Sequence, residues 1–525
     1  MVNVDDADRS RLNTEFEQLL EEQGGSIVGV VVETEPGIAE EVSERVLEIG
    51  GVELADSGII SPSMFAVAVP SDSIPQLTKI DGVELVHHDR KVSIKGAQEV
   101  LQQLPFLTPE RDPVRSFISE SIINATSSVD RYTGSVAISE VEVPHINFAQ
   151  LPPGDPVQLA TSVVSERTRF DLNNKEFVPT ERSVDWIRDS SLTNGSDGSD
   201  TKIAVLDTGH TPVASANGGR SPHLESQVPG EPPLDGMGHG SWCTYTAVGQ
   251  PAPSTWGTCK GVAEGAHYAH YKCLNTFPGF GQTSWILKSM RRALDWGADV
   301  VSMSLGGKQQ GPVDEDPYCR FIERNCKENA GDDDGAIFVV AAGNSGPDQY
   351  QIGSPGVAPK ALTVGSWSLK DDAPSFYSSR GPQGEWYGGN GEEMDDHVAE
   401  YGVDEFVKPD VAAPGGGRET AEKDEEEAEL LHQVETGWVE GMHDGLRDTR
   451  GMMKGTSMAT PHVAGLVLRL YEAGIIHTAA EVKQVVDDRA EVEEYPDAAE
   501  GANETYRGKN IAVGFGPIRE SLFEP

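Results

Sequence analysis

A stretch of small residues that begins at Gly455 places a serine where an apolar helix should start. After Thr456 and Ser457, apolar residues recur at helical spacing up to Tyr471. A hydroxyl at a helix N-terminus lies near unpaired backbone N–H groups and the positive end of the helix dipole. That setting suits a nucleophile whose reaction builds negative charge on a neighbouring oxygen. This stretch alone is equally consistent with Thr456 or Ser457 only capping the helix.

A serine nucleophile needs an adjacent base, and a third group must hold that base in place. His239 offers an imidazole between two glycines, and Asp207 offers a carboxylate at the end of an apolar segment. Asn344 follows another apolar segment and offers an amide donor for an oxyanion. The chain order Asp, His, Ser is that of subtilisin, whereas α/β-hydrolases have Ser, Asp, His. An α/β-hydrolase esterase is therefore disfavoured, also because Ala459 stands where its nucleophile motif needs glycine.

The elements that would position these side chains are predicted to form a layered α/β scaffold. From residue 201 onward, short apolar segments alternate with helical patterns, which is typical of such a fold. Several segments are apolar on both faces, which predicts a mostly parallel, doubly wound sheet with helices on both sides. The expected strands are Lys202–Leu206, His267–Leu274, Asp299–Leu305, Ala336–Ala342 and Ala361–Val364, and the expected helices are Ser284–Trp296, Cys319–Asn329 and Ala480–Val486. Functional groups gather at the carboxyl ends of such strands, where Asp207, Gly306 and Asn344 lie.

The N-terminal part of the chain forms a separate small unit over about residues 26–95. Its strand-like and helical segments alternate in an order that suits a ferredoxin-like α+β sandwich. Its His87-His88 pair is interpreted as a strand end that faces solvent. We expect three regions: a small domain at 1–97, a proline-rich linker or accessory segment of unassigned role at 98–180, and the α/β domain at 181–525.

The chain has 525 residues and a net charge of -44, with 41 Lys and Arg against 85 Asp and Glu. Nucleic acid and anionic membranes are disfavoured as partners, because both would repel this charge. Acidic residues spread along the chain suit a surface that stays hydrated in strong salt, so we infer a halophilic source. The charged N-terminus shows no signal peptide or membrane span, which predicts a cytoplasmic protein, or a secreted one if the start codon is misassigned. Five sparse cysteines predict free thiols, with a Cys319–Cys326 bridge left open.

Taken together, these motifs resemble those of the subtilisin-like serine proteases, the subtilase (peptidase S8) family. Each fragment is modest alone, but the set follows the family's order between about residues 201 and 467. The fragments are Val205–Gly209, Gly238–Gly240, Gly261–Ala266, Ser302–Gly307, Ala341–Gly346, Phe376–Pro382, Lys408–Gly415 and Gly455–Gly465.

The resemblance implies a serine endopeptidase that hydrolyses peptide bonds through an acyl-enzyme intermediate. Ser457 would attack the carbonyl, His239 would transfer the proton and Asp207 would orient the imidazolium. Asn344 and the Ser457 backbone N–H would bind the oxyanion. The implied substrate-binding residues are Ser304, Leu305, Gly306, Ala342 and Gly343. Polypeptides are the implied substrates; no metal or cofactor is required for the chemistry, and a structural calcium is possible but cannot be placed.

The 26–95 unit resembles the family's inhibitory propeptide, which implies a zymogen whose own N-terminal domain blocks the cleft. The chain departs from the family at Ser241-Trp242-Cys243, where Thr-His-Val is usual, and at Glu264, which replaces a proline. An acidic insertion at about 416–450 is a surface segment that could alter substrate access. The alternative function is a catalytically inactive subtilase-fold binding or scaffold protein. Serine reactivity separates the two hypotheses, and the filled catalytic positions favour the enzyme.

Overall fold

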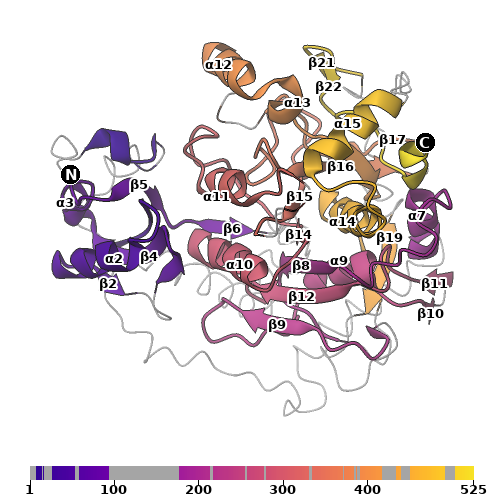
Figure 1. The fold of residues 1–525 in the computed structure, drawn as a ribbon, viewed down its shortest axis with the longest axis horizontal. Helices are drawn as coiled ribbons and strands as arrows, with labels where there is room; N and C mark the ends of the chain where they lie inside the picture. Colours follow the sequence, from indigo (N-terminus) through magenta and orange to yellow (C-terminus); the bar gives the residue numbers. More distant parts are fainter. Residues whose placement is uncertain are drawn as a thin grey trace, which may run out of the picture. The chain divides into compact units, whose positions relative to one another are not determined.

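The computed structural model describes the chain in several segments, which form two compact units, one ending at Arg90 and one beginning at Lys91 (Figure 1). The described residues are 8–14, 16, 27–53, 58–93, 177–416, 433–438, 450–490 and 503–525. Within 177–416 the exceptions are 213–216, 255–256, 277–278, 330, 332–333, 370–371, 384–385 and 387–390. Most of the predicted linker and most of the acidic insertion lie outside these residues. Within them, no helix is long and apolar enough to cross a membrane.

The first unit is the predicted ferredoxin-like sandwich. Its elements are β1 (Ile27–Thr34), α2 (Ala39–Glu48), β2 (Val52–Glu53), β3 (Ile59–Ser61), β4 (Met64–Pro70), α3 (Ile74–Leu77) and β5 (Val83–His88), with 3-10 turns η2 (Arg9–Arg11) and η3 (Ser71–Ser73). The antiparallel sheet has the order β2-β4-β1-β5, and β3 pairs with β4. Alternate residues of β1 face the core, where Val30 and Val32 join Val42 and Val46 of α2.

The histidine pair at the end of β5 does not face solvent, so that interpretation is wrong. His87 is fully buried, and its Nε2 lies 2.8 Å from Oε1 of the equally buried Glu33. Leu12 forms a bridge to Val86, and Phe16 stacks on His88, so residues from the N-terminus cover this strand. A carboxylate on the neighbouring strand supplies the polar partner that a buried imidazole needs.

The second unit is built on an eight-stranded sheet in the order β17-β16-β15-β14-β8-β12-β9, with β18 paired to β16. Every pairing is parallel except β16 with β17, which confirms the predicted mostly parallel sheet. The strands are β8 (Lys202–Asp207), β9 (His223–Ser226), β12 (His267–Lys272), β14 (Val300–Met303), β15 (Ile337–Ala341), β16 (Leu362–Ser368), β17 (Ala373–Pro374) and β18 (Val411–Pro414).

Helices cover both faces of this sheet, as predicted. Ile337 and Val339 of β15 share a core with α9 (His239–Val248) and α14 (Thr456–Glu472). Phe338, between them, points the other way and contacts Phe321 of α11 (Pro317–Asn325), with ring centroids 6.5 Å apart. The other helices are α7 (Thr180–Ile187), α10 (Thr283–Asp295), α12 (Gly391–Tyr401), α13 (Val403–Phe406), α15 (Ala479–Arg489) and the 3-10 turn η8 (Glu520–Phe523).

Short strands complete the second unit. They are β6 (Lys91–Ser93), β7 (Phe177–Pro179), β10 (Ala252–Ser254), β11 (Gly257–Cys259), β13 (Phe280–Gln282), β19 (Gln433–Trp438), β20 (Arg450–Met453), β21 (Thr505–Tyr506) and β22 (Lys509–Asn510). β19, within the acidic insertion, is the middle strand of a three-stranded sheet, in which it pairs antiparallel with β20 and parallel with β7.

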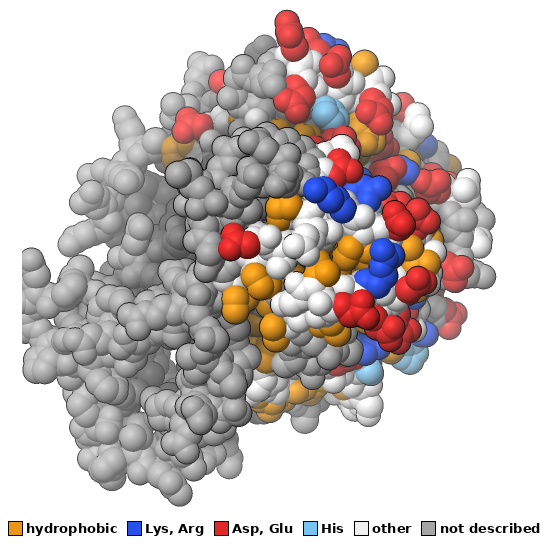
Figure 2. Space-filling view, turned by 90° about the vertical axis from the view of Figure 1, so that its left-hand side faces the viewer, with side chains coloured by type: hydrophobic (Ala, Val, Ile, Leu, Met, Phe, Trp, Pro, Cys, Tyr) orange, Lys and Arg blue, Asp and Glu red, His pale blue; other side chains and the backbone are white. Residues whose placement is uncertain are grey.

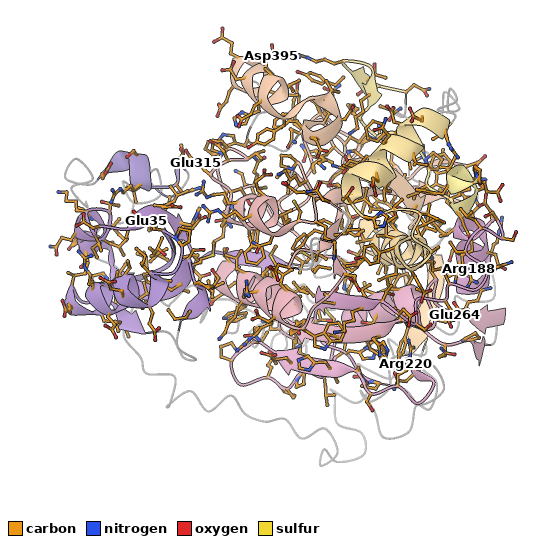
Figure 3. All side chains as sticks on the ribbon, in the orientation of Figure 1. Glu35, Arg188, Arg220, Glu264, Glu315 and Asp395 are labelled. Carbon is orange, nitrogen blue, oxygen red and sulfur yellow. The ribbon has the colours of Figure 1, made fainter. Side chains whose placement is uncertain are left out.

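Two departures from the family pattern have structural partners in this unit. Glu264, in place of a proline, makes an ion pair with Arg188, whose Nη1 lies 2.9 Å from Oε2 (Figure 3). Trp242, in place of a histidine, is fully buried in the core shared with α14. Cys319 and Cys326 are both free thiols, so the bridge left open by the sequence does not form.

Candidate active site

The site begins at the carboxyl end of β8, where the buried strand delivers Asp207. The Asp207 side chain is fully buried, and its Oδ1 accepts a hydrogen bond of 2.7 Å from the backbone N–H of Thr208. Its backbone oxygen accepts from the N–H groups of Cys273 and Leu274 after β12. Since neighbouring strands hold the backbone on both sides, the carboxylate has a fixed position at the edge of the sheet.

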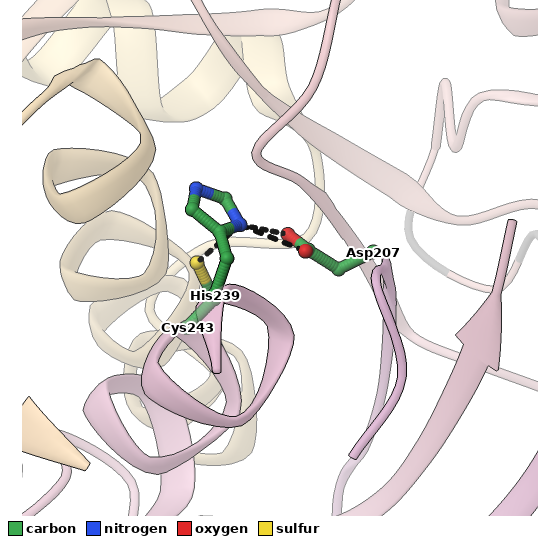
Figure 4. Close-up of side chains that lie close together, drawn as sticks. All are labelled: Asp207, His239 and Cys243. Atoms are coloured by element: carbon green, nitrogen blue, oxygen red, sulfur yellow. Dashed lines mark hydrogen bonds and ion pairs between the residues drawn. The ribbon is translucent and has the colours of Figure 1, made fainter. Parts of the chain in front are cut away.

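His239 is the first residue of α9, and Gly238 before it has φ 97°, a left-handed conformation that favours glycine. The His239 Nδ1 atom lies 2.7 and 2.9 Å from the two oxygens of Asp207 (Figure 4). Burial opposes the charge of His239, but the Asp207 carboxylate outweighs it and raises the His239 pKa well above 6.5. With Nδ1–H donated to Asp207, Nε2 of the neutral ring is left as the proton acceptor.

Ser457 is the second residue of α14, and its environment follows from a proline one turn later. Pro461 lies inside the helix and has no N–H to donate to the Ser457 carbonyl oxygen. That oxygen accepts instead from Ser304 Oγ at 2.9 Å and from Cys243 Sγ at 3.5 Å. The Ser457 hydroxyl donates to the Ser304 carbonyl oxygen at 3.1 Å. The nucleophile candidate is therefore held against the end of β14.

The structure brings Asp207, His239 and Ser457 together from three elements. Cys243 lies one turn after His239 on α9, with its Sγ 3.9 Å from His239 Nδ1 and 3.5 Å from the Ser457 oxygen. It thereby links the histidine helix to the serine helix. The Ser457 hydroxyl contacts Ser304 rather than the imidazole, and catalytic hydrogen bonds often form only with substrate bound.

Asn344 lies beside the start of α14, directly after β15. Its Oδ1 accepts from the Thr456 N–H at 2.9 Å and from Thr456 Oγ1 at 3.0 Å, while Gly343 N–H donates to the same hydroxyl. These bonds fix the amide plane and turn Nδ2 toward Gly455. A Cβ atom added to Gly455 would lie 3.1 Å from Asn344 Nδ2. The amide and the helix N-terminus together make this edge electropositive.

The predicted substrate-binding residues fall into two groups. Ser304, Leu305 and Gly306 follow β14 beside Ser457, although the Leu305 side chain is buried. Ala342 and Gly343 have both backbone groups engaged inside the protein. Ala342 bonds with Val364 and Gly353, and Gly343 bonds with Thr456 and Ser379. These two residues can line a wall but have no backbone group left for an extended substrate.

Sequence reasoning missed Asp235, a buried carboxylate four residues before His239. It ties the loop after β8 to the first turn of α9, because one carboxylate accepts from both. Its Oδ1 accepts from Thr208 Oγ1 (3.0 Å), Met237 N (3.0 Å) and Gly238 N (2.7 Å), and its Oδ2 accepts from Ser241 N (2.7 Å). Thr208 Oγ1 in turn accepts from Gly240 N at 2.9 Å. An aspartate shortly before a helix start was the available signal.

His270 supports the same loop from β12. Its Nε2 accepts from Gly209 N–H at 3.1 Å, and its Nδ1 lies 3.0 Å from Thr244 Oγ1 of α9. Burial first, and then the neighbouring His210, lower the His270 pKa well below 6.5, so the ring is neutral. The neutral ring therefore joins the loop after β8 to α9 through hydrogen bonds.

The fold and the site define a doubly wound α/β protein with a serine, a histidine and an aspartate at the carboxyl edge of its sheet. The sequence profile of the subtilase family, Peptidase_S8, matches residues 198–516, which is more than half of the chain. The chain therefore belongs to the subtilase family.

Individual relatives share a quarter to a third of their aligned residues with this chain. Pyrolysin of Pyrococcus furiosus is 32% identical over 45% of this chain and 16% of its own length. Serine protease AprX of Bacillus subtilis is 29% identical over 55% of this chain and 61% of its own. Sphericase, a solved structure, is 24% identical over 62% of this chain and 92% of its own, with a TM-score of 0.45. The chain thus spans less than two thirds of pyrolysin and of AprX.

Proposed function

We propose that this protein is a serine endopeptidase that cleaves polypeptides through an acyl-enzyme intermediate. The observation that carries the proposal is the Asp207 carboxylate on Nδ1 of His239, with Ser457 at the start of the adjoining helix. Ser457 Oγ attacks the peptide carbonyl while His239 Nε2 takes its proton and then gives it to the leaving amine. Asp207 stabilises the imidazolium, and Asn344 Nδ2 with the Ser457 N–H stabilises the oxyanion.

Substrate binding completes this arrangement in the proposed mechanism. The Ser457 hydroxyl leaves the Ser304 oxygen by rotation about its Cα–Cβ bond and turns toward His239. The Ser304 oxygen loses one donor but is near the path of an extended substrate, whose N–H groups replace it. The extended substrate binds to Ser304–Gly306 as an added strand, through backbone hydrogen bonds of the kind that form when a peptide binds at a sheet edge.

The N-terminal unit is proposed as an intramolecular inhibitor, which makes the protein a zymogen. β6 follows β5 directly in the chain and pairs antiparallel with β13, with Val92 opposite Gly281. β13 lies next to the site, because Gly281 packs against the Cys273 carbonyl, while Cys273 N–H bonds to the Asp207 oxygen. The chain's own residues therefore pair with the short strand β13 near the triad, as a substrate strand would. We expect self-cleavage shortly after Ser93.

Labelling with a serine-directed fluorophosphonate tests the proposal, followed by mass spectrometry of the adduct and of the chain ends. We expect the adduct on Ser457 and its loss in Ser457→Ala, and we expect the Ser457→Ala chain to remain unprocessed. A processed, folded chain without an adduct would favour the inactive binding or scaffold protein. An unprocessed chain without an adduct is labelled again after removal of residues 1–95 by an added protease.

The acidic surface supports a halophilic origin in this proposal. Figure 2 shows Asp and Glu side chains distributed over the described part of one face. At a net charge of -44, self-repulsion is strong in dilute buffer and is screened at high ionic strength. We propose that the protease acts on proteins inside the cell that makes it. Measuring its amount in the cell fraction and in the medium distinguishes this location from secretion.

A further inference from the structure

One thiol next to the triad has no part in the proposed chemistry. Cys243 Sγ, His239 Nδ1 and an Asp207 oxygen all lie within 4.8 Å of one another and are buried (Figure 4). In the part of the chain that the structure describes, this is the one group of three His, Cys, Asp or Glu ligand atoms with such spacing. Sulfur, imidazole nitrogen and carboxylate oxygen are the ligand atoms that zinc takes in proteins.

We propose that Asp207, His239 and Cys243 form a zinc site, and that zinc bound there reversibly switches the protease off. The inhibition rests on the proposed function, whereas the binding does not. The distances are close to those that a tetrahedral ion needs. Bonds of about 2.3 Å to sulfur and about 2.0 Å to nitrogen set these ligand atoms roughly 3.6 Å apart. The observed Sγ–Nδ1 distance is 3.9 Å.

The remaining adjustment is small. Nitrogen and oxygen ligands of a tetrahedral zinc ion lie about 3.3 Å apart, and His239 Nδ1 lies 2.7 Å from Asp207 Oδ1, so this contact must open by roughly 0.6 Å. The thiol must also give up its contact with the Ser457 oxygen, which keeps its bond from Ser304. Three protein ligands leave a fourth position for water.

The charges and protons balance. The Cys243 thiol releases its proton to solvent and binds as thiolate, and Asp207 binds as carboxylate, so the two anions neutralise Zn²⁺. In the neutral ring the proton on His239 Nδ1 moves to Nε2, since a metal on one ring nitrogen leaves the hydrogen on the other; the protonated ring releases one further proton to solvent. Nε2 is then a donor and cannot accept the Ser457 proton. The metal therefore stops catalysis by fixing the wrong tautomer and needs no contact with the nucleophile.

Binding is tested without proteolysis, by titrating the full-length Ser457→Ala chain with Co²⁺ as a zinc probe. Coordination by Cys243 is expected to produce a thiolate-to-cobalt charge-transfer band at one equivalent, which added Zn²⁺ abolishes. The band should be lost in Cys243→Ser. It should remain in Cys326→Ser, the matched control for a thiol far from the triad. A band that survives Cys243→Ser, or none at millimolar Co²⁺, overturns the site.

Inhibition is tested on the active chain with Zn²⁺ and a peptide substrate. The Zn²⁺ concentration for half inhibition should rise at least about tenfold in Cys243→Ser, because even loss of a group outside the ligand shell costs 10–100-fold in metal affinity. Chelation should restore full activity. Equal inhibition of both proteins would overturn the switch. An inactive wild-type chain that still shows the Cys243-dependent band would contradict the proposed function and leave the metal site standing.

Discussion

Asp235 makes a sharp prediction, because one carboxylate joins the loop of Asp207 to the helix of His239. In Asp235→Asn the amide oxygen can keep the three donors at Oδ1, but the amide NH₂ then faces the Ser241 N–H. One charge-assisted hydrogen bond worth about 1.5–3 kcal/mol is lost, and a buried N–H is left without its acceptor. We expect a loss of about 2–4 kcal/mol in the free energy of unfolding.

The effect on catalysis should exceed what stability alone explains. The first turn of α9 carries His239, and displacing a catalytic group by about 1 Å costs on the order of 100-fold. We expect kcat to fall about 10–100-fold with little change in KM, measured with a fluorogenic peptide amide well below the melting temperature. The acid limb of the pH–rate profile should also move toward 6.5 as the contact with Asp207 loosens.

A matched control is available at Asp316, which carries the same pattern at the start of α11. Its Oδ1 accepts from Tyr318 N, Cys319 N and Ser354 Oγ, and its Oδ2 accepts from Gln310 N. Asp316→Asn should therefore cost similar stability while kcat stays near that of the wild type, because α11 lies on the opposite face of the sheet from α9. Equal kcat in the two variants would show that Asp235 is only a structural cap.

Three further predictions concern the site and the surface. The Asp207 carboxylate raises the His239 pKa, so the acid limb of the kcat/KM profile should lie above pH 6.5. For the same reason the contribution of the ion pair to the free energy of unfolding should be complete below pH 6.5 and fade as pH rises through the folded-state pKa. Asp207→Asn should move that limb down and lower kcat by about 10⁴; an unmoved limb would contradict the argument. Asn344→Ala should lower kcat about 10²–10³-fold, the magnitude known from subtilisin. It should also weaken the start of α14, because Asn344 caps the Thr456 N–H. Single-turnover acylation at the wild-type rate would disprove the oxyanion role. Melting temperature and activity should both rise between 0.1 and about 3 M KCl, because salt screens a net charge of -44; a melting temperature that does not change with salt would exclude this.

The sequence predicted the scaffold well because its strongest signals are local. The β8, β12, β14 and β15 segments are apolar runs between helical patterns, and parallel sheets bury such strands on both faces. The ferredoxin-like unit followed from alternation in the same way. His87 was misread, because its burial depends on Glu33 from another strand and on residues near the N-terminus. No pattern within the 82–88 segment carries that information.

By itself, the sequence determined the α/β class, the family resemblance, the acidic charge and the identity of Asp207, His239, Ser457 and Asn344 as candidates. Those inferences need only residue types, order and short-range periodicity. Tertiary structure alone decided that Cys243 contacts the Ser457 carbonyl oxygen, that Ser304 satisfies the carbonyl that Pro461 leaves open, and that β6 pairs with β13. These contacts join segments up to about two hundred residues apart, and side-chain distances between such segments are fixed by packing, not by any local property of the chain.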